Sequence, residues 1–308
     1  MNRRTFSKTV AMAIASGVMA PPELWGAPQR KLKIGITGLI FRATPGTPEN
    51  LEEALKHMSE LGYHWFETWG SVLEHHDKAG ALAPMIEKYG IPLRSAFMGI
   101  NVHDPSKLKE SVDQVVRWGK VLKKHGGSFA VVNAGGVKRE AFSFNEARPH
   151  IVMGLNEHGK ALNDIGLAAG LHQHTGSAVD TPDEVYAVME AVDPKHMKFA
   201  PDTGQLQKAG GDAAKIVKDF KSIVVHMHLK DYKGWEHFQG YCPLGEGKVD
   251  LKAILDTMEE ANPKANIMHE LDGSANQPYT PRETAERSKA YLQKLGYEFR
   301  TKAPKESQ

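Results

Sequence analysis

Eight apolar runs alternate with helix-like segments along this chain, and this alternation limits the possible folds more than any other feature of the sequence. The runs cover residues 32–37, 63–69, 91–97, 128–133, 166–174, 197–202, 223–229 and 265–271. They have the length of buried strands, whereas the segments between them, most clearly residues 108–122, repeat apolar residues at helical spacing. Eight strand–helix units is the number that closes a parallel barrel. We therefore predict an α/β fold, a (β/α)8 TIM barrel.

Length and composition are consistent with one large domain. The chain has 308 residues, of which 41% are apolar and 25% charged, and α/β barrels commonly run to about 250 residues as one unit. Local signals agree with the strand–helix pattern: Thr47 is a candidate cap for the first helical segment, and Thr181 stands three residues before Glu184, the spacing of a capping box. We predict that residues 28–308 form one TIM-barrel catalytic domain.

The amino terminus resembles a twin-arginine export signal, because Arg3, Arg4, Phe6 and Lys8 match its pattern. The apolar stretch that follows, residues 9–20, is shorter than the roughly 20 residues that a membrane-spanning helix needs. We expect residues 1–27 to be a signal segment and the mature protein to be exported or periplasmic. The alternative is a basic tail that carries no signal, and the cleavage position, after Ala20 or after Ala27, stays open.

Charge and cysteine content restrict the partners of the mature chain. Removal of residues 1–27 takes away three cations and one anion, so the formal net charge falls from +2 to 0. A neutral chain has no general attraction for nucleic acid or an anionic membrane, and we expect neither as a partner. The single cysteine, Cys242, excludes an internal disulfide, which is consistent with a route that exports folded proteins. Whether the chain forms a homo-oligomer stays open.

Four polar stretches stand where predicted strands end, and they offer metal-ligand side chains from four separate elements. These stretches are His172-Gln173-His174, Pro201 to Gln205, His226 to Asp231, and Met268 to Asp272. In a parallel barrel the carboxyl ends of all strands meet at one face, so imidazoles and carboxylates from these stretches can converge. Each residue alone is more often a hydrogen-bonded core residue, but together they predict a divalent-metal site. The mixed nitrogen and oxygen donors suit Mn²⁺, Zn²⁺, Co²⁺, Fe²⁺ or Mg²⁺ rather than a thiolate-bound metal.

The same stretches resemble the xylose-isomerase-like TIM-barrel superfamily of sugar isomerases and epimerases, which also includes inosose dehydratases and endonuclease IV. The resemblance depends on Asp202-Thr203-Gly204, on residues 226–231, on Pro243 to Gly247 followed by Val249-Asp250, and on Glu270-Leu271-Asp272. In that family the metal is held by a Glu, an Asp, a His and a second Glu. The resemblance therefore implies that Asp202, His228 and Glu270 are metal ligands.

The first family ligand is where this sequence departs from the pattern. The fifth predicted strand carries His172 where the family has a Glu, and His174 is the alternative if the loop register shifts by two. Family epimerases use two glutamates as acid and base, and a His has a different charge and an ordinary pKa nearer about 6.5. The two-Glu mechanism is therefore not simply transferable, and a lyase or dehydratase is equally plausible on this point.

Several side chains are candidates for catalysis or substrate binding. Glu270, His172 or His174 would move the proton, and Lys230 would steady the developing negative charge. The candidate substrate-binding residues are Glu67, Trp65, Gln205, His226 and Asp272. Trp65 and Trp69 would together offer an apolar face of the kind on which sugars stack. The equal alternative is that both tryptophans are core residues and that Glu67 forms a local ion pair. The aromatic stretch 235–241 is a candidate lid over the site.

The leading functional hypothesis is a metal-dependent sugar isomerase or epimerase that acts on a sugar or keto-sugar. Its rival is a metal-dependent lyase or dehydratase of keto-sugars or inososes. A sugar-binding barrel without catalytic activity is the alternative from another class. A DNA-repair nuclease is disfavoured, because the neutral, exported chain offers no positive face for nucleic acid.

Overall fold

The computed structural model describes residues 30–273 and 277–301. The predicted signal segment, residues 1–27, lies outside the described residues, as does the exact start of the predicted catalytic domain. Within the described ranges, no helix is both long enough and apolar enough to cross a bilayer.

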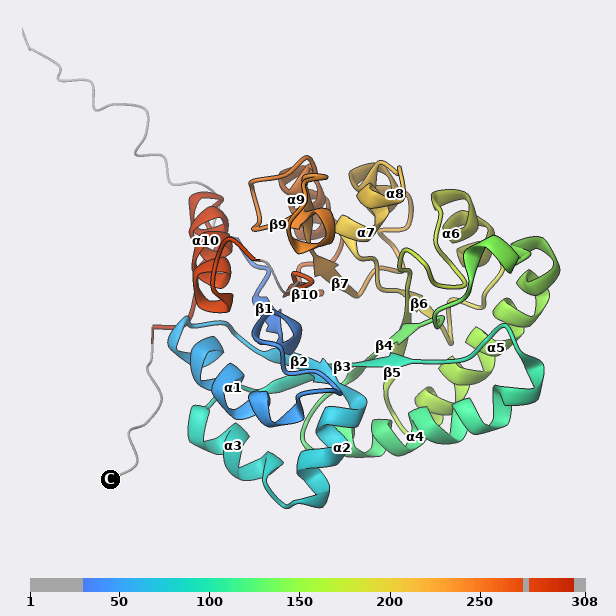
Figure 1. Ribbon diagram of the computed structural model, residues 1–308, viewed down its shortest axis with the longest axis horizontal. Helices are drawn as coiled ribbons and strands as arrows, with labels where there is room; N and C mark the ends of the chain where they lie inside the picture. Colours follow the sequence, from blue (N-terminus) through green and yellow to red (C-terminus); the bar gives the residue numbers. More distant parts are fainter. Residues whose placement is uncertain (1–29, 274–276, 302–308) are drawn as a thin grey trace, which may run out of the picture.

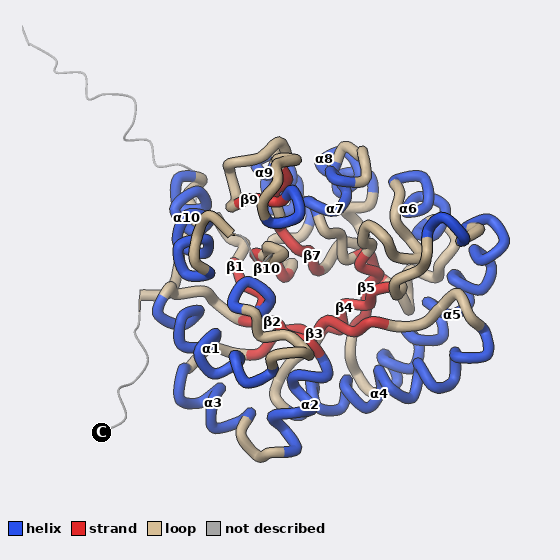
Figure 2. The backbone as a smooth tube through the Cα atoms, in the orientation of Figure 1, coloured by secondary structure: helices blue, strands red, loops and turns tan. Residues whose placement is uncertain are grey.

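Eight parallel strands form the central sheet, in the order β6-β5-β4-β3-β2-β1-β10-β7. They are β1 (Ile34–Thr37), β2 (Phe66–Trp69), β3 (Leu93–Gly99), β4 (Phe129–Asn133), β5 (Ala168–His172), β6 (Lys198–Phe199), β7 (His226–Leu229) and β10 (Asn266–His269). The outermost pair, β6 and β7, is joined by isolated parallel bridges, one of them between Asp202 and His228. Figure 2 shows the resulting ring of strands with helices around it. The predicted TIM barrel is confirmed.

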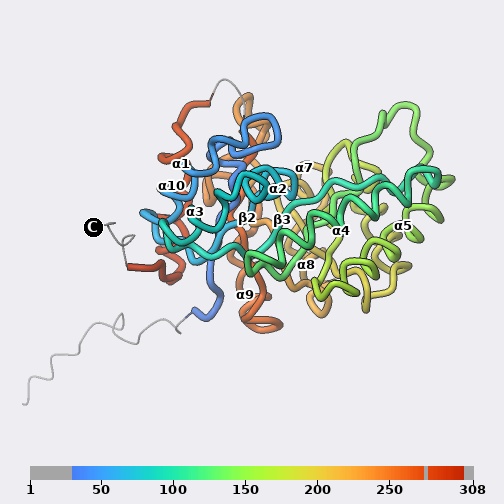
Figure 3. The backbone as a smooth tube through the Cα atoms, turned by 90° about the horizontal axis from the view of Figure 1, so that it is seen from below, coloured from blue at the N-terminus to red at the C-terminus, as the bar shows by residue number. Residues whose placement is uncertain are grey.

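Ten α-helices surround the described part of the barrel (Figure 1). They are α1 (Leu51–Glu60), α2 (Gly70–Lys78), α3 (Leu82–Tyr89), α4 (Leu108–Lys124), α5 (Phe144–Asp164), α6 (Pro182–Met189), α7 (Thr203–Lys208), α8 (Ala213–Asp219), α9 (Leu251–Ala261) and α10 (Pro281–Lys294). The side view shows α3, α2, α4 and α5 along one flank of the molecule (Figure 3). In α4 the buried face is formed by Ser111, Val115, Gly119 and Leu122, which confirms the helical spacing read in this segment.

The core follows from strands that are buried on both faces. Every residue of β1, β4 and β7 is buried, because one face of each strand packs inside the barrel and the other packs against helices. All eight predicted apolar runs contain a strand, but each strand is shorter than its run or shifted relative to it. The shortest is β6, which has two residues.

Two features differ from the sequence expectations. The segment predicted as a lid, residues 235–241, connects the two strands of an antiparallel ribbon, β8 (Asp231–Tyr232) and β9 (Tyr241–Cys242). The hydroxyl of Thr47 does not cap a helix; it donates to the carbonyl of Arg42, and a short 3-10 turn precedes α1. The capping box of α6 is present as predicted, since Thr181 and Glu184 each accept the other's backbone N–H.

Candidate metal and catalytic site

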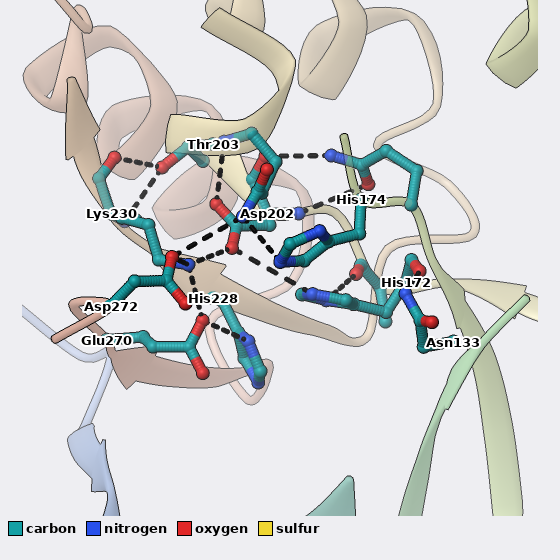
Figure 4. Close-up of polar contacts among 12 residues, drawn as sticks. Asn133, His172, His174, Asp202, Thr203, His228, Lys230, Glu270 and Asp272 are labelled. Atoms are coloured by element: carbon teal, nitrogen blue, oxygen red, sulfur yellow. Dashed lines mark hydrogen bonds and ion pairs between the residues drawn. The ribbon is translucent and has the colours of Figure 1, made fainter. Parts of the chain in front are cut away.

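Four buried side chains converge at the carboxyl ends of β5, β6, β7 and β10. They are His172, Asp202, His228 and Glu270, and each offers one ligand atom within 4.8 Å of the others. Figure 4 shows them around one point, with Lys230 and Asp272 beside them. The structure thus brings together one residue from each of the four polar stretches, as parallel strand ends do when a barrel closes.

His172 is held as a neutral imidazole with one nitrogen directed at the cluster. Its Nδ1 lies 3.3 Å from the carbonyl oxygen of Ala200, which can only accept, so Nδ1 carries the proton. Burial holds the pKa of His172 well below its ordinary value, and the positive charge of His228 lowers this pKa further. The unprotonated Nε2 lies 3.9 Å from Oδ2 of Asp202. This lone pair is therefore available to a cation.

Asp202 supplies a carboxylate oxygen that has no hydrogen-bond donor. Its Oδ1 accepts the backbone N–H of Gln205 at 2.9 Å and caps α7. Its Oδ2 is buried and makes no hydrogen bond among the described residues. Burial raises the pKa of Asp202, and the ammonium of Lys230 opposes that effect. The ammonium of Lys230 lies 2.7 Å from this oxygen, and the unprotonated nitrogen of His172 lies 3.9 Å from it. Two imidazoles and two carboxylates with ligand atoms within 4.8 Å of one another are a donor set that fits a divalent metal.

His228 bridges two carboxylates. Its Nδ1 lies 3.0 Å from Oε2 of Glu270, and its Nε2 lies 2.6 Å from Oε1 of Glu67. Burial alone would lower the pKa of His228, but Glu270 and Glu67 raise it well above its ordinary value. Burial likewise works against the ionised form of Glu270, yet His228 and Lys230 keep its pKa well below its ordinary range. Glu270 is thus held as a carboxylate at the edge of the pocket.

Lys230 is enclosed by three carboxylates. Its Nζ donates to Oδ2 of Asp272 at 2.7 Å and lies 2.7 Å from Oδ2 of Asp202 and 2.8 Å from Oε2 of Glu270. The ring of Tyr241 covers the ammonium at 4.8 Å from its centroid, and Lys230 is 0% exposed. The ammonium of Lys230 therefore binds carboxylates in this structure. The predicted contact of Lys230 with substrate would require the ammonium to leave them.

The motif around Asp202 also shapes the path of Lys230. A Cβ on Gly204 would lie 2.7 Å from Cγ of Lys230, so the glycine leaves the space through which this side chain reaches the carboxylates. The hydroxyl of Thr203 donates to the carbonyl of Lys230 at 2.6 Å and accepts its N–H at 2.9 Å. These contacts fix the end of β7 against the start of α7.

A pocket opens beside the cluster, with an empty space of ≈ 380 Å³ that includes its part open to solvent. It is lined by Thr37, Gly38, Leu39, Glu67, Thr68, Trp69, Phe97, His172, His174, Glu270 and Asp272. One wall is apolar, since Trp69 contacts Phe97 edge to face with ring centroids 4.3 Å apart. The other wall carries carboxylates and imidazoles. The described residues that line the pocket include no Lys or Arg.

The structure separates the two alternatives for the fifth strand. His172 belongs to the buried cluster and also lines the pocket, whereas His174 lines the pocket outside the cluster and is half-buried. The side-chain amide of Gln205 lies 2.7 Å from Nε2 of His174 and 3.4 Å from Oδ2 of Asp272. Gln205 therefore positions two pocket side chains and is itself 1% exposed.

Two candidate substrate-binding residues do not reach this pocket. Trp65 lies under the guanidinium of Arg94, 4.3 Å from its ring centroid, and lines a different surface pocket with Lys33 and Lys264. Trp65 precedes β2 and Trp69 ends it, and four extended residues span about 13 Å, so Trp69 reaches the pocket instead. His226 is fully buried and stacks on Phe129, with centroids 4.7 Å apart.

Sequence reasoning missed Phe97, Ser95 and Tyr241 as parts of the site. Phe97 and Ser95 lie on β3, where an alternating apolar strand gave no polar signal. Tyr241 belongs to the aromatic stretch that was interpreted as a lid, but its contact with Lys230 depends on the β8–β9 ribbon. Only the packing of distant elements could have identified these residues.

The family comparison agrees with the motifs in the sequence. A family model described as a xylose isomerase-like TIM barrel matches residues 55–295, a range that includes all four motifs. The inosose dehydratase of Geobacillus kaustophilus is 27% identical over 197 residues, which are 59% of this chain and 62% of that protein. The inosose dehydratase of Mesomycoplasma hyopneumoniae (strain J) is 24% identical over 217 residues, 66% of this chain and 71% of that protein. The chain thus spans less than two thirds of the Geobacillus relative.

Solved structures share the same barrel. The 3-keto-D-glucoside 4-epimerase YcjR from E. coli, in its apo form, superimposes with a TM-score of 0.68 over 85% of this chain and 99% of the epimerase, at 18% identity. The IOLI protein with a bound zinc atom superimposes with a TM-score of 0.71 over 88% of this chain and 100% of that chain, at 16% identity. At these identities the similarity shows the fold alone.

Proposed function

Because the chain belongs to the xylose isomerase-like TIM-barrel family, we propose that it is a divalent-metal enzyme that moves a proton beside the carbonyl of a keto-sugar or keto-cyclitol. The observation that carries this proposal is the convergence of His172, Asp202, His228 and Glu270 beside an open pocket. The inosose dehydratase relatives and the zinc atom bound by the IOLI protein support it. The two nitrogen and two oxygen donors suit Zn²⁺, Mn²⁺, Co²⁺ or Fe²⁺.

When bound, the metal would supply Lewis-acid polarisation of the substrate carbonyl, which acidifies the neighbouring carbon. Glu270 is the general base, since it lines the pocket as a carboxylate and can accept a proton from a bound substrate. His174 also lines the pocket, and its Nε2, which lies 2.7 Å from the amide of Gln205, would donate a proton once the substrate displaces that amide. Trp69 and Phe97 offer an apolar face to the ring of the substrate.

Elimination is the reaction that this arrangement favours. A two-carboxylate mechanism needs a second glutamate at the cluster, but His172 stands there with Nδ1–H bound to Ala200 and its other nitrogen directed at the cluster. Such an imidazole has no spare site with which to take up or return a proton. Glu270 then removes a proton from carbon, and His174 protonates the departing hydroxyl or alkoxide.

Epimerisation is the second candidate, because His174 and Glu270 both line the pocket. If His174 returns the proton to carbon rather than to a leaving group, the configuration inverts without loss of mass. The two reactions share Glu270 and differ only in the acceptor of the proton that His174 gives.

The pocket favours an unphosphorylated substrate. Its described lining residues include three carboxylates, Glu67, Glu270 and Asp272, but no cationic side chain. The nearby ammonium of Lys230 is fully buried and engaged by carboxylates. Phosphate recognition usually depends on Arg, Lys or free backbone N–H groups, and a phosphate here would meet negative charge.

Proton exchange in D2O tests the proposal. The protein loaded with Zn²⁺, Mn²⁺ or Co²⁺ is incubated with neutral keto-sugars and keto-cyclitols and with their phosphorylated forms, and products are followed by NMR and mass spectrometry. We expect deuterium beside the carbonyl of a neutral substrate and a product lighter by one water or by an aglycone. Glu270→Gln should abolish exchange, whereas Glu184→Gln, which changes a capping-box residue of α6, should retain it. Absence of exchange with every substrate would refute the proposal.

We propose, in addition, that residues 1–27 direct export by the twin-arginine route. The motif Arg3, Arg4, Phe6 and Lys8 supports this. Replacement of both Arg3 and Arg4 by Lys should retain the precursor in the cytoplasm, as measured by fractionation and immunoblotting. Unchanged export of that variant would contradict this part of the proposal.

A further inference from the structure

Glu67 lies beneath the cluster, and both of its oxygens are occupied by protein groups. Oε1 is 2.6 Å from Nε2 of His228, and Oε2 accepts the hydroxyl of Ser95 at 2.5 Å. Nε2 of His226 lies 3.1 Å from Oε2, without the direction of a hydrogen bond. Glu67 is 1% exposed. Glu67 lines the pocket, but its carboxylate is held in place by His228 and Ser95 inside the barrel.

The contact with Glu67 decides which nitrogen of His228 can bind a metal. The hydroxyl of Ser95 donates to Oε2 of Glu67, and Nε2 of His228 lies beside Oε1, so both oxygens of this group are placed as acceptors. Without a metal, both nitrogens of His228 face carboxylates and both carry protons, whereas a metal-binding imidazole gives up one of them. The contact to Glu67, at 2.6 Å, is shorter than the contact to Glu270, at 3.0 Å, so the proton that remains is the one on Nε2. The lone pair is then on Nδ1, which is the nitrogen that faces Glu270.

We propose that Glu67 is a positioning residue that fixes the Nε2–H tautomer of His228 and directs Nδ1 at the metal. This inference rests on the proposed function in one respect, namely that His228 is a metal ligand. Ser95 supports the contact between Glu67 and His228, because its hydrogen bond prevents the carboxylate of Glu67 from rotating away. Outer carboxylates that hold metal-ligating histidines typically contribute about 10–100-fold to metal affinity or activity.

Metal affinity, measured separately from turnover, tests the proposal. Zn²⁺ affinity of the full protein is determined by competition with a chromogenic chelator for wild type, Glu67→Ala, Glu67→Gln and Ser95→Ala. We expect Glu67→Ala to weaken Zn²⁺ binding by about 10–100-fold. Glu67→Gln should weaken it less, because the amide oxygen can still accept, and Ser95→Ala should have a small effect. Glu184→Gln, which alters a buried glutamate of α6 outside the cluster, should bind Zn²⁺ like wild type.

Nitrogen NMR of the Zn²⁺-loaded protein, with ¹⁵N-labelled histidine, gives a readout that a purely structural role would not move. We expect the His228 proton on Nε2 in wild type and in Ser95→Ala, and a loss of that single state in Glu67→Ala. Ser95→Ala keeps the experiment informative if Glu67→Ala does not fold.

The outcomes separate this inference from the proposed function. Tight Zn²⁺ binding that depends on Glu67, without turnover of any sugar, would support the inference and refute the proposed reaction. Equal Zn²⁺ affinity in all Glu67 variants, or a proton on Nδ1 of His228, would overturn the inference while the reaction could stand. Absence of metal binding by wild type would overturn both.

Discussion

At the residue scale, the site is organised by charges that compensate one another inside the barrel. Asp202, Glu270 and Asp272 are held together by one ammonium, that of Lys230, in a place without solvent. Burial alone would lower the pKa of Lys230, but Asp202 and the other two carboxylates raise it well above its ordinary value. The charge of Lys230 therefore stabilises the folded protein as well as holding the carboxylates of the site in place.

Removal of that charge should destabilise the metal-free protein. Lys230→Met leaves buried carboxylates without their cation, and breaking a buried pair in this way costs about 3–5 kcal/mol. Urea unfolding of the metal-free protein measures the change. Lys252→Met, which breaks an exposed pair with Asp256 on α9, is the control and should change the free energy of unfolding by less than about 1 kcal/mol. Equal effects of the two variants would contradict the enclosed arrangement.

A histidine far from the pocket should set part of the pH dependence of stability. His158 on α5 is buried; its Nδ1 lies 2.7 Å from the carbonyl of Gly154 and its Nε2 2.8 Å from the hydroxyl of Ser111. Burial lowers the pKa of His158 in the folded protein, with the backbone contact to Gly154 opposing the shift. Its contribution is therefore complete above the unfolded pKa of about 6.5 and is lost as the pH falls from there toward the folded pKa.

The comparison of wild type with His158→Gln isolates this contribution, since other titrating groups are common to both. Urea midpoints between about pH 7.5 and pH 5 should fall more steeply for wild type than for the variant. Parallel curves for the two proteins would show that His158 does not titrate as its burial implies.

At the scale of elements, Asp231 organises the loop after β7. Its carboxylate accepts four backbone N–H groups, from Tyr232, Gly245, Gly247 and Val249, at 2.8–3.1 Å. A Cβ on Gly247 would lie 2.1 Å from Oδ1 of Asp231, so the glycine permits this close approach. The sequence motif from Pro243 to Asp250 is thus explained by one buried carboxylate that holds the loop.

Loss of the hydrogen bonds to Asp231 should increase the mobility of the loop after β7. Asp231→Ala removes the acceptor of the N–H groups of Gly245, Gly247 and Val249, at a cost of about 1–3 kcal/mol for each of these groups that water does not reach. Hydrogen exchange should rise in residues 243–250 and remain unchanged in β3, which lies elsewhere in the barrel. Unchanged exchange in the loop would show that the loop is held by other contacts.

The helix starts offer a sharper comparison, because the sequence suggested two caps and the structure contains one of them. Thr181→Ala removes the side chain that accepts the N–H of Glu184 and should destabilise the protein by about 1 kcal/mol. Thr47 makes no cap hydrogen bond, and Thr47→Ala loses only its contacts to Arg42 and Thr44. Differential scanning calorimetry should therefore show a larger decrease in Tm for Thr181→Ala than for Thr47→Ala.

At the scale of the whole molecule, the barrel links the candidate metal site to stability, since its four candidate ligands stand at the carboxyl ends of β5, β6, β7 and β10. A metal that binds only the folded chain stabilises it by about 2.7 kcal/mol when its free concentration is 100 times its Kd. We expect a chelator to lower the Tm of wild type and to leave that of Asp202→Asn unchanged. If neither metal nor chelator changes the Tm of wild type, this result would contradict the proposed metal site.

The order of residues along the chain determined the architecture and three of the four side chains of the cluster. Strand and helix periodicities are local, so eight strand–helix units could be identified before any contact was known. The rule that parallel strand ends share one face then brought the four polar stretches together, and the family resemblance selected Asp202, His228 and Glu270 within them. The family resemblance, confirmed by the match to residues 55–295, depended on the same local motifs.

Tertiary structure alone decided which neighbouring side chain took which place. In an extended strand His172 and His174 would share one face, but β5 ends at His172, so His172 joins the cluster and His174 lies in the loop that lines the pocket outside it. Trp69 rather than Trp65 reaches the pocket, and Glu67 meets His228 across 161 positions of sequence. The positions of these side chains depend on how distant strands are aligned to within a few ångströms. Local sequence patterns carry no information about that alignment.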